Sequence, residues 1–126
     1  MRLFCTVGGL IWSLDVNKKV ALTYQIFESN MNDMLSKYPT RKLQHVDMVF
    51  FPIYAYEHFY LVCYNLKNPS YEIIDNIKRD EDPKAYYGKI PFILHSHFVK
   101  YVQWKGLQIK SQIFRKLKPS YLSMPW

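Results

Sequence analysis

The residues best suited to chemistry in this 126-residue chain are a histidine and an aspartate near its centre. His58 opens the apolar run HFYLVCYN, and Asp75 closes the run YEIID, which follows a short polar turn. Burying either group is costly unless it is paired. An aspartate that accepts a hydrogen bond from one imidazole nitrogen leaves the other nitrogen to take a proton from a nucleophile. The two residues are therefore either incidental polar ends of a hairpin or a pair with a chemical role.

The register of the hairpin decides whether the two side chains meet, because side chains alternate between faces along a strand. If Lys67 and Asn68 form a two-residue loop, Asp75 falls opposite Tyr60. His58 and Asp75 are then diagonal neighbours on one face, with backbones about 7–8 Å apart. A four-residue loop adds a step of about 6–7 Å and separates them. The sequence permits the contact without requiring it.

Neither cysteine fits the role of a nucleophile for this pair. Cys63 is an odd number of positions from His58, so it lies on the opposite face of a buried strand. Cys5 precedes the histidine, but FCTVGG lacks the aromatic-flanked helix start of cysteine proteases with that order. There is no G-x-S-x-G motif to support a serine hydrolase. Two cysteines fit a reduced, intracellular protein of the nucleus or cytoplasm better than a disulfide framework.

The composition is that of a globular chain with its positive charge concentrated in the C-terminal part. Hydrophobic residues make up 49% and charged residues 21%, and the net charge is +7 at pH 7. No acidic residue follows Asp82, so this region favours an anionic partner such as nucleic acid or an acidic protein. The longest nearly uncharged apolar stretch, 48–56, is far shorter than the ~20 residues of a membrane helix, and we expect no membrane partner.

The apolar pattern predicts an α+β order that would position the pair. Helices are expected from about Lys19 to Lys37 and from Pro91 to Lys105, the second with a buried stripe of Leu94, Phe98, Tyr101 and Val102. Strands are expected at Val46–Ile53, Phe59–Leu66 and Tyr71–Ile74. The segment IDNIKRDEDPKAYYGK is polar and reads as a surface connection, and the final PSYLSMPW is strand-like.

The hairpin and the strand before it resemble a known family. VFFPI, EHFYLVCYNLKN and YEIIDN are similar to the catalytic domain of the ubiquitin-like-protein-specific cysteine proteases of the SUMO-protease type, especially divergent, often transposon-associated plant members. In that family a strand with FxPI precedes a His-aromatic-x-L-V strand, a short turn and a strand ending in Asp. The resemblance implies a partial papain-like cysteine protease fold over 43–126, with a central, mostly antiparallel sheet and flanking helices. Residues 1–42 would form an N-terminal helical segment.

The resemblance also implies roles for three residues. His58 would be the catalytic base and Asp75 its orienting acid. Phe59 stands where the family usually has a Trp that covers the Gly-Gly tail of the substrate, so it would bind substrate, but this departure leaves the preferred modifier open. The implied activity is a thiol protease that hydrolyses precursors or conjugates of ubiquitin-like or SUMO modifiers. No cofactor or metal is implied.

One part of the family pattern is missing. In the family, the Asp is followed by a helix and a short strand. After these come a Gln that forms the oxyanion hole and an Asp-Cys-Gly motif that carries the nucleophile. Here residues 91–105 and YLSMPW match the helix and the strand. The sequence reaches Trp126 without the family's oxyanion-hole Gln or its Asp-Cys-Gly motif. We therefore expect a truncated catalytic domain without peptidase activity of its own. Losing the nucleophile helix should uncover the strands at 46–53 and 59–66 and leave the chain marginally stable.

Two other functions remain open. A basic nucleic-acid-binding module is favoured by the acid-free region and the aromatic residues interleaved in it, Tyr86, Tyr87, Tyr101 and Trp104. An inactive remnant could also bind a modifier without cleaving it.

No metal site is expected. His95 and His97 are the only close pair of histidines, and residues i and i+2 of a helix point about 200° apart. We expect one of them at the surface and the other half-buried.

Overall fold

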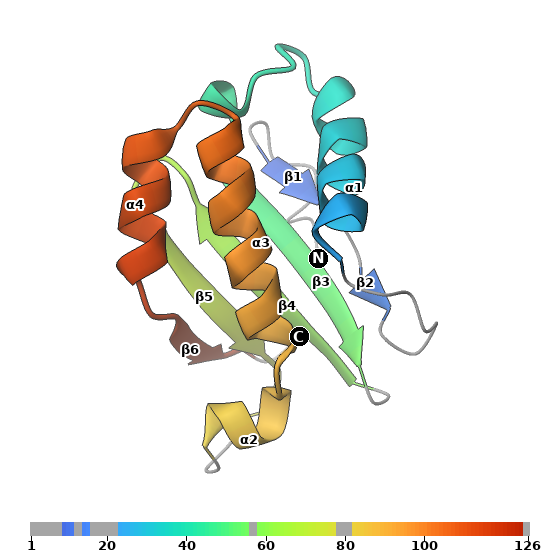
Figure 1. The fold of residues 1–126 in the computed structure, drawn as a ribbon. Coiled ribbons are helices and arrows are strands. Elements are labelled where there is room, and N and C mark those ends of the chain that lie inside the picture. The colour runs from blue at the N-terminus through green and yellow to red at the C-terminus, as the bar shows by residue number, and fades with distance from the viewer. Residues whose placement is uncertain (1–8, 12–13, 16–22, 56–57, 78–81, 125–126) are drawn as a thin grey trace.

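The computed structural model shows an α+β fold built around one mixed sheet (Figure 1). It describes residues 9–11, 14–15, 23–55, 58–77 and 82–124. The elements follow in the order β1 (Gly9–Ile11), β2 (Leu14–Asp15), α1 (Tyr24–Ser36), a 3₁₀ turn (Leu43–His45), β3 (Met48–Ala55), β4 (His58–Asn65), β5 (Ser70–Asp75), α2 (Pro83–Tyr87), α3 (Ile90–Trp104), α4 (Gln108–Lys116) and β6 (Ser120–Ser123).

The sheet has the strand order β1-β3-β4-β5-β6, and β2 also pairs with β3. The long central strands β3, β4 and β5 are antiparallel neighbours. The short strands β1 and β2 run parallel to β3, and β6 runs parallel to β5. This architecture confirms the predicted α+β class with a mostly antiparallel centre.

Helices α1, α3 and α4 cover one face of the sheet, and the core lies between them (Figure 1). Phe51 of β3 sits at its centre, with ring centroids 5.8 Å from Phe27 of α1 and 6.1 Å from Phe98 of α3. Tyr64 of β4 stacks on Phe98 at 3.8 Å. Aromatic rings from four elements therefore pack together in one layer and hold α3 against the strand that starts with His58.

Helix α1 begins and packs as its sequence predicts. The Thr23 side chain accepts a hydrogen bond from the Ile26 N–H at 3.3 Å and caps the first turn. Phe27, Met31 and Leu35 recur every four residues and are buried. The helix is shorter than expected at its start, and residues 19–22 lie outside the described residues.

Helix α3 also matches its prediction closely. Pro91 lies in its first turn, where a missing N–H costs little, and Gly106 follows its end with φ +85°, a conformation that favours glycine. The predicted stripe of Leu94, Phe98, Tyr101 and Val102 is buried, and Val99 joins it.

Three features of the fold were not predicted. Helix α4 occupies a segment for which we expected no element, and β1 and β2 lie in the N-terminal segment expected to be helical. Helix α2 lies within the expected surface connection, and its last residue, Tyr87, is buried. Buried residues of α1 belong to the same hydrophobic core as those of the later strands and helices. The predicted division into residues 1–42 and 43–126 stays a prediction.

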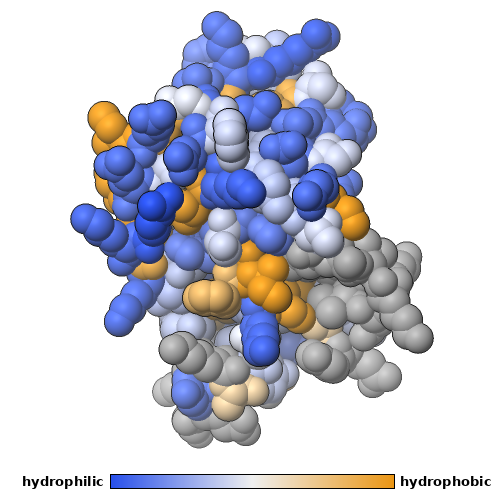
Figure 2. All heavy atoms as spheres, in the orientation of Figure 1, coloured by the Kyte–Doolittle hydropathy of each residue, from blue (hydrophilic) through white to orange (hydrophobic). Residues whose placement is uncertain are grey.

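The expected uncovering of the central strands is wrong. On the face opposite the helices, Phe50 and Leu61 are only 3% and 5% exposed. The register places Phe50 opposite Cys63 and Pro52 opposite Leu61 on this face. Exposed apolar side chains lie on α3, α4 and β6 and at Phe59 of β4, and Figure 2 shows hydrophobic residues over α4 and over the lower end of α3. No helix in the described ranges is long and apolar enough to cross a membrane.

Candidate active site

His58 and Asp75 form a hydrogen-bonded pair at one end of the β4–β5 hairpin. The ladder runs from Leu61 opposite Ile74 to Asn65 opposite Ser70, which is the register predicted for a two-residue loop. His58 Nε2 lies 2.7 Å from Asp75 Oδ1. The predicted contact is therefore confirmed.

Two hydrogen bonds stabilise the turn that sets this register. The Asn65 side-chain oxygen accepts from the Asn68 backbone N–H at 2.9 Å, and the Leu66 N–H donates to the Asp47 carbonyl at 2.7 Å. Pro69 lacks an N–H and stays outside the ladder, so the strands end one pair earlier than expected.

Three donors surround the Asp75 carboxylate, which is only 2% exposed. Oδ1 accepts from His58 and from the Ile77 backbone N–H at 3.2 Å, and Oδ2 accepts from the Tyr87 hydroxyl at 2.7 Å. Burial by itself raises the pKa of Asp75, but the hydrogen bonds from Tyr87, His58 and Ile77 outweigh it and lower the pKa below the ordinary value. The group is therefore an anion at neutral pH.

The charge on Asp75 determines the tautomer of His58. An ionised carboxylate can only accept hydrogen bonds, so Nε2 of His58 must donate the proton they share. When the imidazole is neutral, Nδ1 is then left with its lone pair. The His58 side chain is 19% exposed, so a reactant can reach the ring. The arrangement is suited to general base catalysis at Nδ1.

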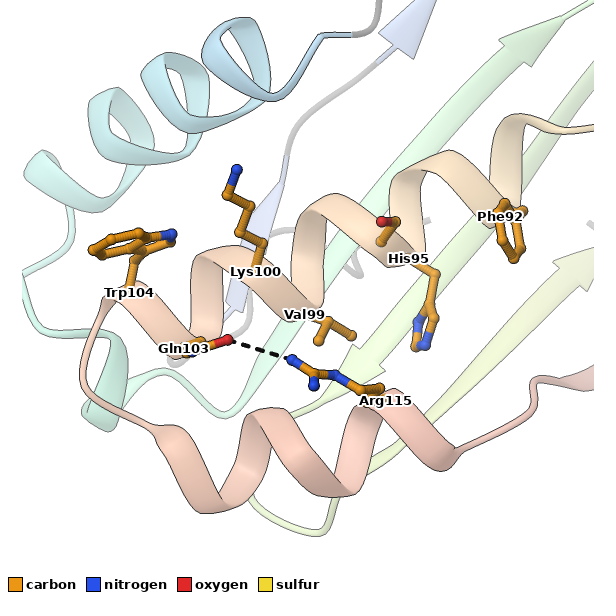
Figure 3. Close-up of a pocket in the computed structure, with 8 residues that line it drawn as sticks. Phe92, His95, Val99, Lys100, Gln103, Trp104 and Arg115 are labelled. Atoms are coloured by element: carbon orange, nitrogen blue, oxygen red, sulfur yellow. Dashed lines mark hydrogen bonds between the residues drawn. The ribbon is translucent and has the colours of Figure 1, made fainter.

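A cavity of about 230 Å³ lies beside His58, lined also by Ala55, Tyr60, Tyr86 and Tyr87. The Tyr86 ring meets the His58 ring edge-on, with centroids 6.3 Å apart. A larger hollow of about 610 Å³ lies along α3 (Figure 3), where Arg115 of α4 donates to the Gln103 side chain at 3.4 Å. His58, Asp75 and Phe59 do not line this larger hollow, whereas His58 lines the smaller cavity.

Phe59 follows His58 on the opposite face of β4. Its side chain is 58% exposed, and its ring centroid lies 4.5 Å from that of Tyr54. The exposed Phe59 ring, packed against a partly exposed Tyr54, is available for contact with a partner. Its role in binding substrate stays a prediction.

Cys63 is not placed to act as a nucleophile. It lies on the face opposite His58 and is 5% exposed. Burial, assisted by the charge of Glu72, raises the pKa of its thiol to about 12. Cys5 lies outside the described residues.

The other two candidate histidines are structural. His95 Nδ1 lies 3.0 Å from the Tyr64 hydroxyl, and its ring stacks on Tyr71 at 4.5 Å. His97 packs between Tyr24 and Phe27. Both histidines are half-buried, so the expectation of one at the surface was wrong. Among the described residues, no group of three or more His, Cys, Asp or Glu could hold a metal ion.

Tyr87 is the site residue that the sequence analysis missed. It lies in a segment read as a surface connection, and it was counted only among aromatics for nucleic-acid stacking. The structure buries both Tyr87 and Tyr101, and their hydroxyls donate to Asp75 and Asn32. Of the four aromatic residues proposed for base stacking, Trp104 is the most accessible, at 71% exposed. The stacking surface required of a nucleic-acid module is therefore largely absent from these four residues.

Comparison with known proteins gives matches among solved structures only. No family model and no curated protein matches the chain. The SUMO protease Ulp1 with its catalytic cysteine oxidised to a sulfinic acid matches with a TM-score of 0.52 at 15% identity, over 96% of this chain and 50% of that one. The sulfonic acid form gives a TM-score of 0.53 with the same identity and coverage.

The fold is that of the SUMO protease domain. At this level of identity the likeness concerns the fold alone, and it agrees with the papain-like architecture predicted above. The C-terminal Ulp1 protease domain in complex with Smt3, the yeast orthologue of SUMO, matches at a TM-score of 0.46. The chain spans about half the length of these proteins.

Proposed function

We propose that this chain carries the base and the orienting acid of a cysteine peptidase site that acts on ubiquitin-like modifiers of the SUMO type. The single observation that carries the proposal is the 2.7 Å contact between His58 Nε2 and an ionised, buried Asp75. Its place in a fold shared with SUMO proteases supports the reaction class.

In this proposal, His58 Nδ1 removes the proton of a thiol, and the resulting thiolate attacks the carbonyl carbon of the scissile bond. The imidazolium that forms is stabilised by Asp75 and then gives its proton to the leaving amine. Cys63 does not supply the thiol, because it is buried on the other face of β4. The nucleophile and the oxyanion donor are supplied by residues other than those described here.

The proposed substrate contact is Phe59. Its ring is 58% exposed and follows His58 directly in the chain, so it offers an apolar surface along which a Gly-Gly tail could lie. Every charged residue after Asp82 is Lys or Arg, so the C-terminal part can attract an acidic modifier. A modifier-binding remnant without activity would use the same surface. We place the protein in the nucleus or cytoplasm.

Binding of a SUMO-type modifier tests this proposal. The isotope-labelled chain is titrated with a modifier ending in Gly-Gly and with the same modifier lacking those two residues. We expect chemical-shift changes at His58 and Phe59, and an affinity at least ~10-fold weaker, about 1.4 kcal/mol, without the tail. Phe59→Ala should weaken binding similarly, whereas Phe92→Ala, at a 76% exposed aromatic on α3, should not.

Two results would contradict the proposal. Binding that is insensitive both to the tail and to Phe59→Ala would show that the modifier does not contact this site. Tighter, salt-dependent binding to a DNA duplex than to the modifier would favour the nucleic-acid module.

A further inference from the structure

We propose that Tyr87 is a positioning residue of this site, whose hydroxyl holds the Asp75 carboxylate in the orientation that His58 requires. The inference rests on the proposed function for its catalytic meaning. The structural role, in which the Tyr87 hydroxyl fixes the orientation and charge of Asp75, does not depend on that function and follows from the contacts of the two residues.

The two oxygens of Asp75 are held from opposite directions. Oδ2 accepts from the Tyr87 hydroxyl at 2.7 Å, while Oδ1 accepts from His58 and the Ile77 N–H. Rotation of the carboxylate about its Cβ–Cγ bond would break contacts at both oxygens together. The plane of the carboxylate is therefore fixed, and with it the direction in which Oδ1 presents its lone pairs to Nε2.

Tyr87 is itself held firmly. Its side chain is 7% exposed. Its ring centroid lies 4.7 Å from that of Tyr60 in β4 and 5.0 Å from that of Tyr86, and it stacks on Tyr121 of β6 at 6.2 Å with an interplanar angle of 12°. Rings from β4, α2 and β6 thus set the position of the hydroxyl.

A phenol suits this position chemically. A hydroxyl donor to a carboxylate makes a short, charge-assisted hydrogen bond that favours the ionised form. A lysine or arginine there would also favour ionisation, but its positive charge would offset the field that Asp75 exerts on a developing imidazolium. Tyr87 therefore keeps Asp75 ionised while leaving its negative charge available to His58.

The contact makes helix α2 part of the site. Asp75 ends β5, and the chain returns twelve residues later with Tyr87 to the carboxylate it has just left. The orientation of the His58–Asp75 pair depends in this way on the docking of a five-residue helix against the strand ends.

The test compares Tyr87→Phe with Tyr121→Phe. Tyr121 supplies the ring stacked on Tyr87, and its hydroxyl makes no hydrogen bond among the described contacts, so it is a matched control. Two nuclear magnetic resonance readouts are followed: the proton on His58 Nε2 and the pH titration of the Asp75 carboxyl carbon. In Tyr87→Phe we expect the pKa of Asp75 to rise and the Nε2 proton to exchange with water at least ~10-fold faster. Tyr121→Phe should leave both readouts as in the unmodified chain.

Wild-type values for both readouts in a folded Tyr87→Phe chain would overturn the proposal and make Tyr87 a packing residue. If Tyr87→Phe does not fold, the unmodified chain decides, because its Tyr87 hydroxyl proton must be protected from exchange. A hydroxyl proton that exchanges as fast as that of a free tyrosine would overturn the proposal equally. These readouts need neither modifier nor peptidase activity, so failure of the proposed function would leave them unchanged.

Discussion

Asp75 is a buried carboxylate whose two oxygens receive hydrogen bonds from His58, Tyr87 and the backbone of Ile77. Water is largely excluded from it, and this alone would favour the protonated acid. The three donors reverse that preference. The consequence for His58 is a fixed tautomer with Nδ1 as the available base.

The lowered pKa of Asp75 predicts a pH dependence of stability. The unfolded chain takes up a proton at the ordinary pKa of about 3.8, and the folded chain does so only at lower pH. The stabilisation is thus complete above the ordinary pKa and is lost as the pH falls through the folded pKa. Asp75→Asn should cost about 2–3 kcal/mol of unfolding free energy at pH 7 and less near pH 3. Urea unfolding at both pH values measures this, and an equal cost at both would contradict it.

Cys63 should be chemically silent in the folded chain. A pKa shift from 9.0 to about 12 lowers the thiolate fraction near neutral pH roughly 1000-fold. In a Cys5→Ser background, we expect a thiol reagent at pH 8 to label Cys63 at least ~10-fold slower in the native chain than in urea. The chain alone should also fail to hydrolyse a SUMO-type precursor. Turnover that disappears on Cys63→Ala would refute the assignment of this cysteine as structural.

The pair could be anticipated from sequence because two local rules allow it, although they leave the length of the turn open. Alternation along β4 and β5, together with a short polar turn, places His58 and Asp75 on one face. No local rule of this kind predicts the contact of Tyr87 with Asp75. Its contact depends on how a charged connection folds back over the strand ends, which tertiary packing decides.

At the scale of elements, helix α3 packs against β4, the strand that carries His58. Its Phe98 is fully buried between Phe51, Tyr64 and Phe114, whereas Phe92, six residues earlier, is 76% exposed. The same helix therefore offers a core phenylalanine and a surface phenylalanine for comparison.

Phe98→Ala should lower the unfolding free energy by about 3–5 kcal/mol, because it leaves a cavity in the aromatic layer. Phe92→Ala should change it by no more than about 0.5 kcal/mol. Chemical denaturation of the two variants under the same conditions measures the contrast. Equal effects would mean that α3 does not dock on the sheet as described.

The strands were predicted better than α4 for a physical reason. Strands β3 and β4 are apolar on both faces of the pleat, a pattern that stands out in sequence. In α4, Ile109 is 77% exposed and Ile113 is 42% exposed, while Phe114 and a serine, Ser111, are buried. Ile109, Ile113 and Phe114 recur at helical spacing, so α4 is amphipathic, but the helix is only nine residues long and tertiary packing decides which of these side chains is buried.

At the scale of the whole molecule, one edge of the sheet carries exposed apolar side chains. Tyr121, Leu122 and Met124 are 47%, 41% and 49% exposed. They belong to or follow β6, which in the described part of the chain pairs only with β5. An edge strand with exposed apolar side chains favours association with another chain or segment.

We therefore expect the isolated chain to be marginally stable, to bind a hydrophobic dye and to self-associate. Leu122→Lys should reduce both dye fluorescence and association, because it places a charge on the exposed edge. Gln112→Lys, at an exposed polar position of α4, adds the same charge without removing apolar surface and should do neither. A monodisperse monomer that unfolds sharply and binds no dye would show that this edge does not promote self-association.

The most direct test of the central claim is the nitrogen chemical shifts of His58 in the folded chain at neutral to mildly alkaline pH. The pairing with Asp75 predicts a protonated, pyrrole-like Nε2 and an unprotonated, pyridine-like Nδ1. Asp75→Asn should abolish this strong preference, because a neutral amide can either donate or accept. If the proton resides instead on Nδ1, or is shared equally as in a free imidazole, His58 is not held by Asp75 as a base and the proposed site is wrong.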